Sequence, residues 1–262
     1  MQSEPHAELV AFIKNASQIM LFTGAGISTG SGIQDFRGPK GFWKTHQPVM
    51  YPDFMKDESA RVEYWNQKLI AYPSFKAALP NAAHRACVQI EEAGKLGLLV
   101  TQNVDGLHRK AGSAEDKLVE LHGTNTQVQC QTCKAKSEPD SAFAFFEKHR
   151  SCPRCECGGF LKPATISFGQ NLRPDDLEKA EACANTTDLV IALGSTLSVY
   201  PAAEFPLIAA REGVPYVIIN RGPTEHDEMK LVSLRLEGDV AELFPPAVDK
   251  ALQYKHLFFC GR

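Results

Sequence analysis

The sequence predicts an α/β fold, a Rossmann-like parallel sheet with a second, smaller lobe inserted into it. Short, continuous apolar segments recur along the 262 residues, and segments with helical periodicity precede them. Strands buried on both faces of a parallel sheet are apolar at nearly every position, and their alternation with helices is typical of a sheet covered on both faces. Two long stretches interrupt this alternation, as expected for one large domain with an insertion.

The predicted elements of the sheet follow in order along the chain. A helix over residues 8–16, with Leu9 and Ile13 on its apolar face, precedes a strand over residues 19–23 that ends in glycines. We expect later strands over residues 98–101, 189–193 and 216–219, and helices before them over residues 82–93, 175–184 and 202–211. Each helix and strand pair is expected to extend one parallel sheet.

The two interruptions define the predicted smaller lobe. Residues 40–81 have few strand signals and contain Pro48, Pro52 and Pro73, so they are expected to form a flap and a helical insertion. Residues 124–165 hold a cysteine cluster and form the second insertion. The remaining segments, 1–39, 82–123 and 166–262, are assigned to the parallel-sheet lobe. The tail over residues 254–262 is either a packed terminal segment or a frayed one.

Composition excludes several classes of protein. The net charge of −3 and the pI of about 6.2 argue against direct nucleic-acid binding. No run of 18 apolar residues is present, which argues against a membrane span. The first six residues are polar and lack the order of a signal peptide, so we expect a cytoplasmic protein with reduced thiols.

Five of the eight cysteines fall between Cys130 and Cys157, which favours a metal site over disulfides. Two C-x-x-C pairs, Cys130 with Cys133 and Cys152 with Cys155, match the four-cysteine pattern of structural zinc. Cys157 is followed by two glycines and is an equally good end for the second pair. Four of the five thiols are therefore expected to bind zinc, and one of the last three is spare. A redox cluster and a nucleic-acid-binding zinc ribbon are the alternatives.

A glycine-rich turn follows the first predicted strand, over residues 24–30 (GAGISTG). Glycines allow backbone to approach phosphate oxygens closely, so Gly24, Ala25, Gly26 and Ser28 are candidate phosphate contacts. The spacing differs from the usual G-x-G-x-x-G, and no acidic residue ends a second strand ~20 residues on, which argues against an ordinary dehydrogenase. The alternative is a tight turn that holds no ligand.

Asp35, Phe36 and Arg37 lie between glycines farther along this loop. Phenylalanine can cover a flat ring, and arginine can pair with a phosphate or a carboxylate. A ligand-covering flap is therefore one interpretation, and a surface turn closed by a salt bridge is the other.

Polar residues follow the second predicted strand. Gln102, Asn103 and Asp105 come directly after it, at the edge where ligands bind in open parallel sheets. Their side chains can contact an amide and sugar hydroxyls. His122 precedes a glycine at the end of an apolar stretch, and a histidine there can titrate near neutral pH as a general base. The alternative for His122 is a structural role, which is the role expected for His84 and His108.

Together and in this order, these segments resemble the sirtuins, which are NAD-dependent protein-lysine deacylases. The resemblance runs from about residue 8 to residue 246. It is carried by GAGIS (24–28), GIQDFRGPKGFW (32–43), TQNVDGLH (101–108), HG (122–123), the cysteine pairs, SFGQ (167–170), GSTLSVYPAAEFP (194–206) and INRGPT (219–224). It implies a Rossmann-like NAD-binding lobe, a small lobe with zinc and helices, and a substrate cleft between them.

The resemblance also implies roles for individual residues. His122 matches the catalytic base, Asn103 the residue that orients the nicotinamide ribose, and Asp105, with Val104, the group that holds the nicotinamide amide. The other implied NAD contacts are Gly24, Ala25, Gly26, Ser28, Asp35, Phe36, Arg37, Gln102, Gly194, Ser195, Thr196, Asn220, Arg221 and Asp239. The implied substrate contacts, between which an extended peptide adds as a strand, are Phe168, Gly169, Leu197 and Val199.

The activity implied is removal of acetyl groups from lysine in proteins or peptides, with release of nicotinamide and O-acetyl-ADP-ribose. Two positions depart from the family pattern, Gln34 in place of the usual proline and Gln170 in place of a common glutamate. Protein mono-ADP-ribosyl transfer, which uses the same cleavage of NAD, is one alternative. A non-catalytic NAD-binding module is the other, although the presence of His122, Asn103 and Asp105 together argues against it.

Overall fold

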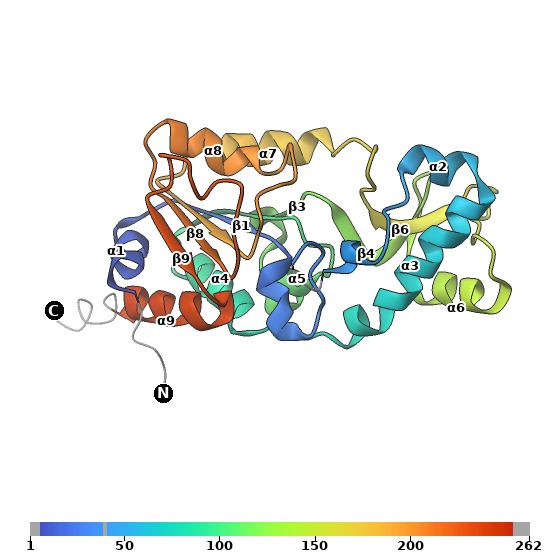
Figure 1. Cartoon of the computed structure of the whole chain (residues 1–262), viewed down its shortest axis with the longest axis horizontal. Coiled ribbons are helices and arrows are strands. Elements are labelled where there is room, and N and C mark those ends of the chain that lie inside the picture. Colours follow the sequence, from blue (N-terminus) through green and yellow to red (C-terminus); the bar gives the residue numbers. More distant parts are fainter. Residues whose placement is uncertain (1–5, 39–40, 254–262) are drawn as a thin grey trace.

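The computed structural model describes residues 6–38 and 41–253. A parallel sheet with the strand order β3-β2-β1-β7-β8-β9 forms the larger lobe (Figure 1). Its strands are β1 (Ile19–Thr23), β2 (Leu96–Thr101), β3 (Leu118–Glu120), β7 (Leu189–Leu193), β8 (Tyr216–Asn220) and β9 (Leu234–Glu237). Every residue of β1, β7 and β8 is buried, which confirms the prediction that these apolar segments are strands covered on both faces.

Helices cover both faces of this sheet (Figure 1). On one face lie α1 (Ala7–Asn15), α4 (Ala82–Glu92) and α9 (Val240–Gln253), and on the other lie α7 (Pro174–Ala184) and α8 (Glu204–Arg211). Leu9, Ile90 and Phe244 pack together under the first group, and Phe22 and Phe205 belong to the apolar cluster under the second. The burial of apolar side chains in these two layers holds the sheet between its helices.

Chain order reverses in the middle of the sheet. From β1 the chain builds β2 and then β3 toward one edge, and from β7 it builds β8 and then β9 toward the other. β1 and β7 are hydrogen-bonded neighbours, paired from Ile19 with Leu189 to Thr23 with Leu193. From these two strands the chain proceeds toward opposite edges of the sheet, and such a switch point is where open parallel sheets bind ligands.

The smaller lobe combines chain from both interrupting stretches (Figure 1). The first stretch contributes a 3-10 turn, η2 (Phe42–Lys44), and the helices α2 (Tyr51–Lys56) and α3 (Glu58–Ala77); the second contributes β4 (Gly123–Cys130), β5 (Lys136–Ser137), α6 (Asp140–His149) and β6 (Leu161–Thr165). Phe54 and Trp65 from the first stretch pack with Val128, Phe143 and Phe146 from the second. Neither stretch could bury these aromatic rings alone.

Some elements differ from the prediction. Three elements, β3, β9 and α9, were not predicted. β3 has only three residues and β9 is a half-buried edge strand, so neither forms a long apolar run, and α9 contains Pro245 and Pro246, which are unusual inside a helix. α3, in the predicted helical insertion, has 20 residues. Short turns of 3-10 helix, η1 (Ala25–Ser31) and η3 (Glu115–Lys117), and one short α-helix, α5 (Leu107–Ala111), complete the described chain.

No described helix has both the length and the apolarity needed to cross a membrane. The tail over residues 254–262, with Cys260, lies outside the described residues.

Candidate active site and metal centre

A cavity of about 720 Å³ opens at the carboxyl ends of the sheet strands and extends to the smaller lobe. Its size is typical of a small-molecule site, and its position is the switch point between β1 and β7. The predicted site residues that line it are Gly24, Ala25, Gly26, Asp35, Phe36, Arg37, Gln102, Asn103, Val104, His122, Phe168, Gly169, Gly194, Ser195, Thr196, Val199, Asn220, Arg221 and Asp239. Segments that are far apart in the sequence therefore share one cavity.

Three glycines, Gly24, Gly26 and Gly194, form what we call the glycine floor of this cavity. The backbone N–H of Gly26 donates to the carbonyl of Gly194 at 2.8 Å. A Cβ on Gly24 would lie 2.7 Å from the Gly194 oxygen, and one on Gly26 would lie 2.7 Å from the Gly194 Cα. Gly194 itself has a φ of +64°, a conformation that L side chains rarely adopt. Glycine is required here because the loops after β1 and β7 touch through their backbones.

The polar end of β2 lies beside this floor. The Asn103 side chain uses its amide hydrogens inside the fold, because Nδ2 donates to the Gly24 carbonyl at 3.1 Å and to Ser28 Oγ at 3.2 Å. Its amide oxygen remains available to a hydroxyl donor in the cavity. Gln102 Nε2 donates to Ser195 Oγ at 2.8 Å, which links the ends of β2 and β7. The side chains predicted to contact a ligand are therefore held by the loops around them.

His122 follows β3 and lines the cavity near the smaller lobe. Its Nδ1 lies 3.0 Å from the carbonyl oxygen of Gln102. A carbonyl oxygen only accepts hydrogen bonds, so Nδ1 carries the proton and Nε2 keeps a free lone pair. Burial lowers the pKa of His122, the Gln102 carbonyl opposes this effect, and the positive charge of Arg37 adds to it. The neutral imidazole is thus the stable form at neutral pH.

Gly123 gives His122 its place between the lobes. It has a φ of +74°, and a Cβ there would lie 2.1 Å from the carbonyl oxygen of Ala164 in β6. The His122 carbonyl accepts the backbone N–H of Ile166 at 2.7 Å. The histidine–glycine pair singled out in the sequence therefore sits where the chain leaves the large sheet and pairs with the small one.

Aromatic side chains line the mouth of the cavity. Phe36 stacks on Trp43 with ring centroids 5.7 Å apart, and Trp43 meets Phe168 edge to face at 6.3 Å. Asp35 stabilises the turn before them by accepting the Gly38 N–H at 2.7 Å. The segment with Phe168 is tied to the smaller lobe, since its carbonyl accepts the Tyr51 N–H at 2.8 Å. The loop with Phe36 and the segment with Phe168 thus form one apolar rim.

The metal centre lies in the smaller lobe. The Sγ atoms of Cys130, Cys133, Cys155 and Cys157 all lie within 4.8 Å of one another, with Cys130 to Cys157 at 3.5 Å and Cys133 to Cys155 at 3.7 Å. A tetrahedral zinc with Zn–S bonds of ~2.3 Å requires S–S separations of about 3.8 Å. The four thiols, called the zinc cluster below, therefore fit zinc. Four protein ligands would leave no open coordination position, so a zinc ion bound there would be structural.

The structure decides which of the three alternatives, Cys152, Cys155 and Cys157, is spare, and it does not pair Cys152 with Cys155. Cys152 is the spare thiol, because its side chain packs in the aromatic core of the smaller lobe. Its Sγ lies 3.6 Å from the Leu161 carbonyl, and burial raises its pKa to about 11. The second pair of ligands is Cys155 and Cys157. The chain after this pair passes close to the first pair, because a Cβ on Gly159 would lie 2.6 Å from Cys130 Sγ.

Comparison with known proteins gives the family. The model of the Sir2 family matches residues 24–201. An NAD-dependent protein deacetylase of Rhodopseudomonas palustris is 42% identical over 92% of this chain and 95% of its own length. One of Sulfolobus acidocaldarius is 40% identical over 95% of both chains.

The chain belongs to the Sir2 family. The resemblance predicted from its motifs is thereby confirmed, and sirtuins are NAD-dependent protein deacylases. Among solved structures, a Sir2 protein with a p53 peptide and NAD+ superposes with a TM-score of 0.83 at 33% identity, covering 96% of this chain and 98% of that one. A Sir2 protein bound to an acetylated peptide gives 0.81 at 33% identity, covering 95% and 98%.

Three predicted site residues of the sirtuin lie behind the cavity wall rather than on it. Ser28 and Asp105 are buried and joined by a 2.7 Å hydrogen bond from Ser28 Oγ to Asp105 Oδ2. Burial raises the pKa of Asp105, although the N–H of Leu107 and the Ser28 hydroxyl lower it in part. Leu197 is fully buried and has a φ of 55°. In this structure these side chains lie behind neighbours that line the cavity.

The sequence prediction missed a group of wall residues from α3. Tyr64, Gln67 and Lys68 line the end of the cavity in the smaller lobe. Tyr64 bonds Thr165 at 3.1 Å between hydroxyl oxygens, and burial lowers the pKa of Lys68 to about 8. Their spacing of three and four residues puts them on one helical face, but the same spacing describes an ordinary packed face. The sequence carried no signal that separates the two cases.

Proposed function

We propose that this sirtuin is an NAD-dependent protein-lysine deacetylase in which His122 acts as the general base, and that its products are nicotinamide, O-acetyl-ADP-ribose and the free lysine. One observation carries the proposal. His122 lines the shared cavity with its Nδ1 committed to the Gln102 carbonyl, 3.0 Å away, which leaves Nε2 as a base. The curated relatives named as deacetylases support the reaction class.

The residues of the cavity fit NAD. At the glycine floor the wall is bare backbone, because a Cβ on Gly24, Gly26 or Gly194 would collide with the opposite loop, and phosphates can approach such a surface. Asn103 would orient the ribose through its amide oxygen, while Phe36 and Arg37 would cover the nicotinamide end. When bound, NAD supplies a glycosidic C–N bond whose breakage gives the sugar oxocarbenium character.

The chain positions the acylated lysine and moves a proton. Phe168 and Gly169, which follow β6, and Val199, which follows β7, all line the cavity, so an extended peptide held between these segments would bring its acyl-lysine toward His122. His122 Nε2 would remove the proton from a ribose hydroxyl and so make the oxygen of that hydroxyl a better nucleophile toward the acyl carbon. Gln170 stabilises the turn that contains Phe168 and Gly169, since its side-chain oxygen accepts the Ser167 N–H at 3.2 Å.

The proposal is tested with His122→Tyr and His122→Asn, with the exposed His149→Asn as the matched control. We expect both His122 variants to fold, to retain zinc and to lose about 10²–10⁴-fold in kcat on an acetyl-lysine peptide. The control is expected to be unaffected. Mass spectrometry with and without NAD measures the loss of acetyl groups. Near wild-type turnover by either His122 variant would contradict the role of this residue.

The pH profile gives a second measurement. Because the folded enzyme has a His122 pKa below the ordinary value of 6.5, the base is lost only as pH falls through that lower value. Activity should therefore persist below pH 6.5 and then decline.

With NAD labelled in its adenosine, the label is expected on a released acyl sugar. Label found mainly on protein would favour mono-ADP-ribosyl transfer instead.

A further inference from the structure

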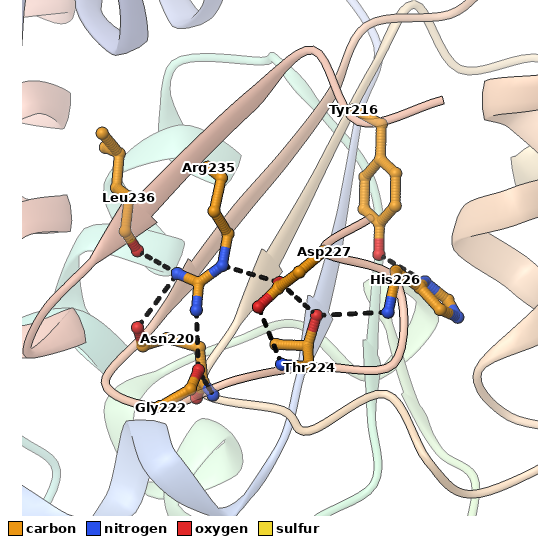
Figure 2. Close-up of polar contacts among 8 residues, drawn as sticks. All are labelled: Tyr216, Asn220, Gly222, Thr224, His226, Asp227, Arg235 and Leu236. Atoms are coloured by element: carbon orange, nitrogen blue, oxygen red, sulfur yellow. Dashed lines mark hydrogen bonds and ion pairs between the residues drawn. The ribbon is translucent and has the colours of Figure 1, made fainter. Parts of the chain in front are cut away.

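Arg235 on β9 makes a set of contacts that the reaction does not explain. Nε donates to Asp227 Oδ1 at 2.7 Å, and Nη2 donates to the Gly222 carbonyl at 2.6 Å. Nη1 donates to the carbonyls of Asn220, at 3.1 Å, and Leu236. Figure 2 shows the guanidinium surrounded by these acceptors. One side chain therefore joins the end of β8, the loop that follows it and the edge strand β9.

The loop is held from its far side as well. Asp227 accepts the Thr224 N–H at 2.9 Å and the Thr224 hydroxyl at 2.5 Å (Figure 2). His226, fully buried, contacts the hydroxyls of Tyr216 at 3.0 Å and Tyr200 at 3.3 Å. The chain between Asn220 and Asp227 is thus fixed by side chains, with Arg235 at the centre.

The hydrogen bonds of Arg235 and Asp227 hold one wall of the cavity. Asn220, Gly222 and Pro223 line the cavity, whereas Arg235 and Asp227 do not. In the sheet, β3 and β8 are separated by four strand spacings in the order β3-β2-β1-β7-β8, or about 19 Å. His122 follows β3 and Asn220 ends β8, so this wall lies at the opposite end of the cavity from the base. A dinucleotide whose nicotinamide is at His122 would place its adenosine half here.

We propose that Arg235 is a positioning residue, which holds the segment from Asn220 to Pro223 in the conformation that binds the adenosine half of NAD. This inference rests on the proposed function for the orientation of the dinucleotide. Loss of a contact that binds ground state and transition state alike raises KM and leaves kcat unchanged, and we expect the contacts of the adenosine half to be of this kind. A residue that only stabilised β9 would lower the unfolding temperature without this selective effect.

The test compares Arg235→Gln and Arg235→Lys with a matched control, Arg211→Gln. Arg211 pairs with Glu204 on the surface of α8 and does not line the cavity. We expect Arg235→Gln to raise KM for NAD and the Kd for ADP-ribose about tenfold, which corresponds to ~1.4 kcal/mol. kcat and KM for the peptide should stay within twofold. Arg235→Lys should be intermediate, since an ammonium cannot reproduce the planar fork of donors.

ADP-ribose binding by calorimetry separates this inference from the proposed function, because it needs no turnover. An enzyme that bound ADP-ribose normally but lacked deacetylase activity would contradict the function alone. If Arg235→Gln does not fold, Arg235→Lys and Asp227→Asn, which removes the charge that Arg235 contacts, are measured instead. A Kd within twofold of wild type in folded Arg235 variants would overturn the inference, as would an equal rise in KM for NAD and for the peptide.

Discussion

The zinc cluster and the glycine floor are built in opposite ways. The four ligand cysteines lie within residues 130–157, at the end of β4, in the turn that follows it and in the turn that precedes its neighbour β6. The glycine floor joins the loop after β1 to the loop after β7, so that Gly26 meets Gly194 across 168 residues, the difference 194 − 26. One centre is assembled from chain neighbours and a metal, and the other from direct backbone contact between distant segments.

This difference shows where each centre is vulnerable. The zinc cluster depends on the bonds of four thiols to one ion, and the remaining small-lobe core is one cluster of aromatic and aliphatic side chains. The glycine floor depends on the absence of side chains, because a Cβ at any of its three positions has no room. Removing a group should therefore damage the first centre, and adding one should damage the second.

The largest effect is expected from the zinc cluster. Cys157→Ser removes a ligand and should release zinc, with a loss of folding free energy on the order of 10 kcal/mol for the smaller lobe. Cys152→Ser, the matched control, removes the spare thiol and should retain one zinc per chain. Elemental analysis and thermal unfolding measure both. Zinc loss from Cys152→Ser with retention by Cys157→Ser would reverse the ligand assignment.

A smaller effect is expected from the buried histidines behind the glycine floor. His84 Nε2 lies 3.4 Å from Ser28 Oγ. Burial, followed by the positive charge of Arg85, lowers the pKa of His84 from 6.5 to about 4. The unfolded chain therefore binds more protons between these pH values, and stability falls as pH falls from 6.5 to 4, by roughly 3 kcal/mol in total. Above pH 6.5 this contribution is fully present.

His84→Gln should flatten that part of the pH dependence. Urea unfolding at pH 7, 6 and 5 measures it, and the slope should decrease by at most ~1.4 kcal/mol per pH unit. His108, whose ring centroid is 4.9 Å from that of His84 and whose pKa burial also lowers, remains and keeps part of the slope. The zinc cluster is the same in both proteins, so its own acid sensitivity cancels. Parallel stability curves would exclude His84 as a source.

The smallest effect compares two glycines in cavity loops. Gly26→Ala would place a Cβ 2.7 Å from the Gly194 Cα, and we expect it to lower the free energy of unfolding by about 1–3 kcal/mol and to weaken ADP-ribose binding. Gly222→Ala meets no atom within 4 Å and should change stability by less than about 0.5 kcal/mol. Urea unfolding of both variants gives the comparison. Equal destabilisation would show that the glycine floor is not closed by backbone contact.

Much of the fold was predictable because burial leaves a direct trace in the sequence. β1, β7 and β8 are apolar at nearly every position, since both faces are covered, and each was predicted within one residue of its ends. β9 is only half-buried, and α9 contains adjacent prolines within a helix, so neither shows the usual pattern. Their places in the sheet and its cover depend on contacts with β8, α1 and α4.

The site was predictable in its residue types but not in its arrangement. The sequence indicated that Gln102 and His122 belong to a site, but not that the carbonyl of one fixes the proton on the other. It left Cys152, Cys155 and Cys157 as alternatives, and the packing of Cys152 in the small-lobe core decided among them. Arg235 had no motif, because its acceptors are mostly backbone carbonyls.

The sequence by itself determined the family of the protein, the parallel sheet and the presence of a four-thiol metal centre, because buried strands, glycine turns and paired cysteines are local patterns. Tertiary structure alone decided which thiol is spare, which predicted residues face the cavity and which lie behind it, and what holds the wall at Asn220. These outcomes depend on distances between segments that are remote in the chain, and a linear pattern of residues does not contain them.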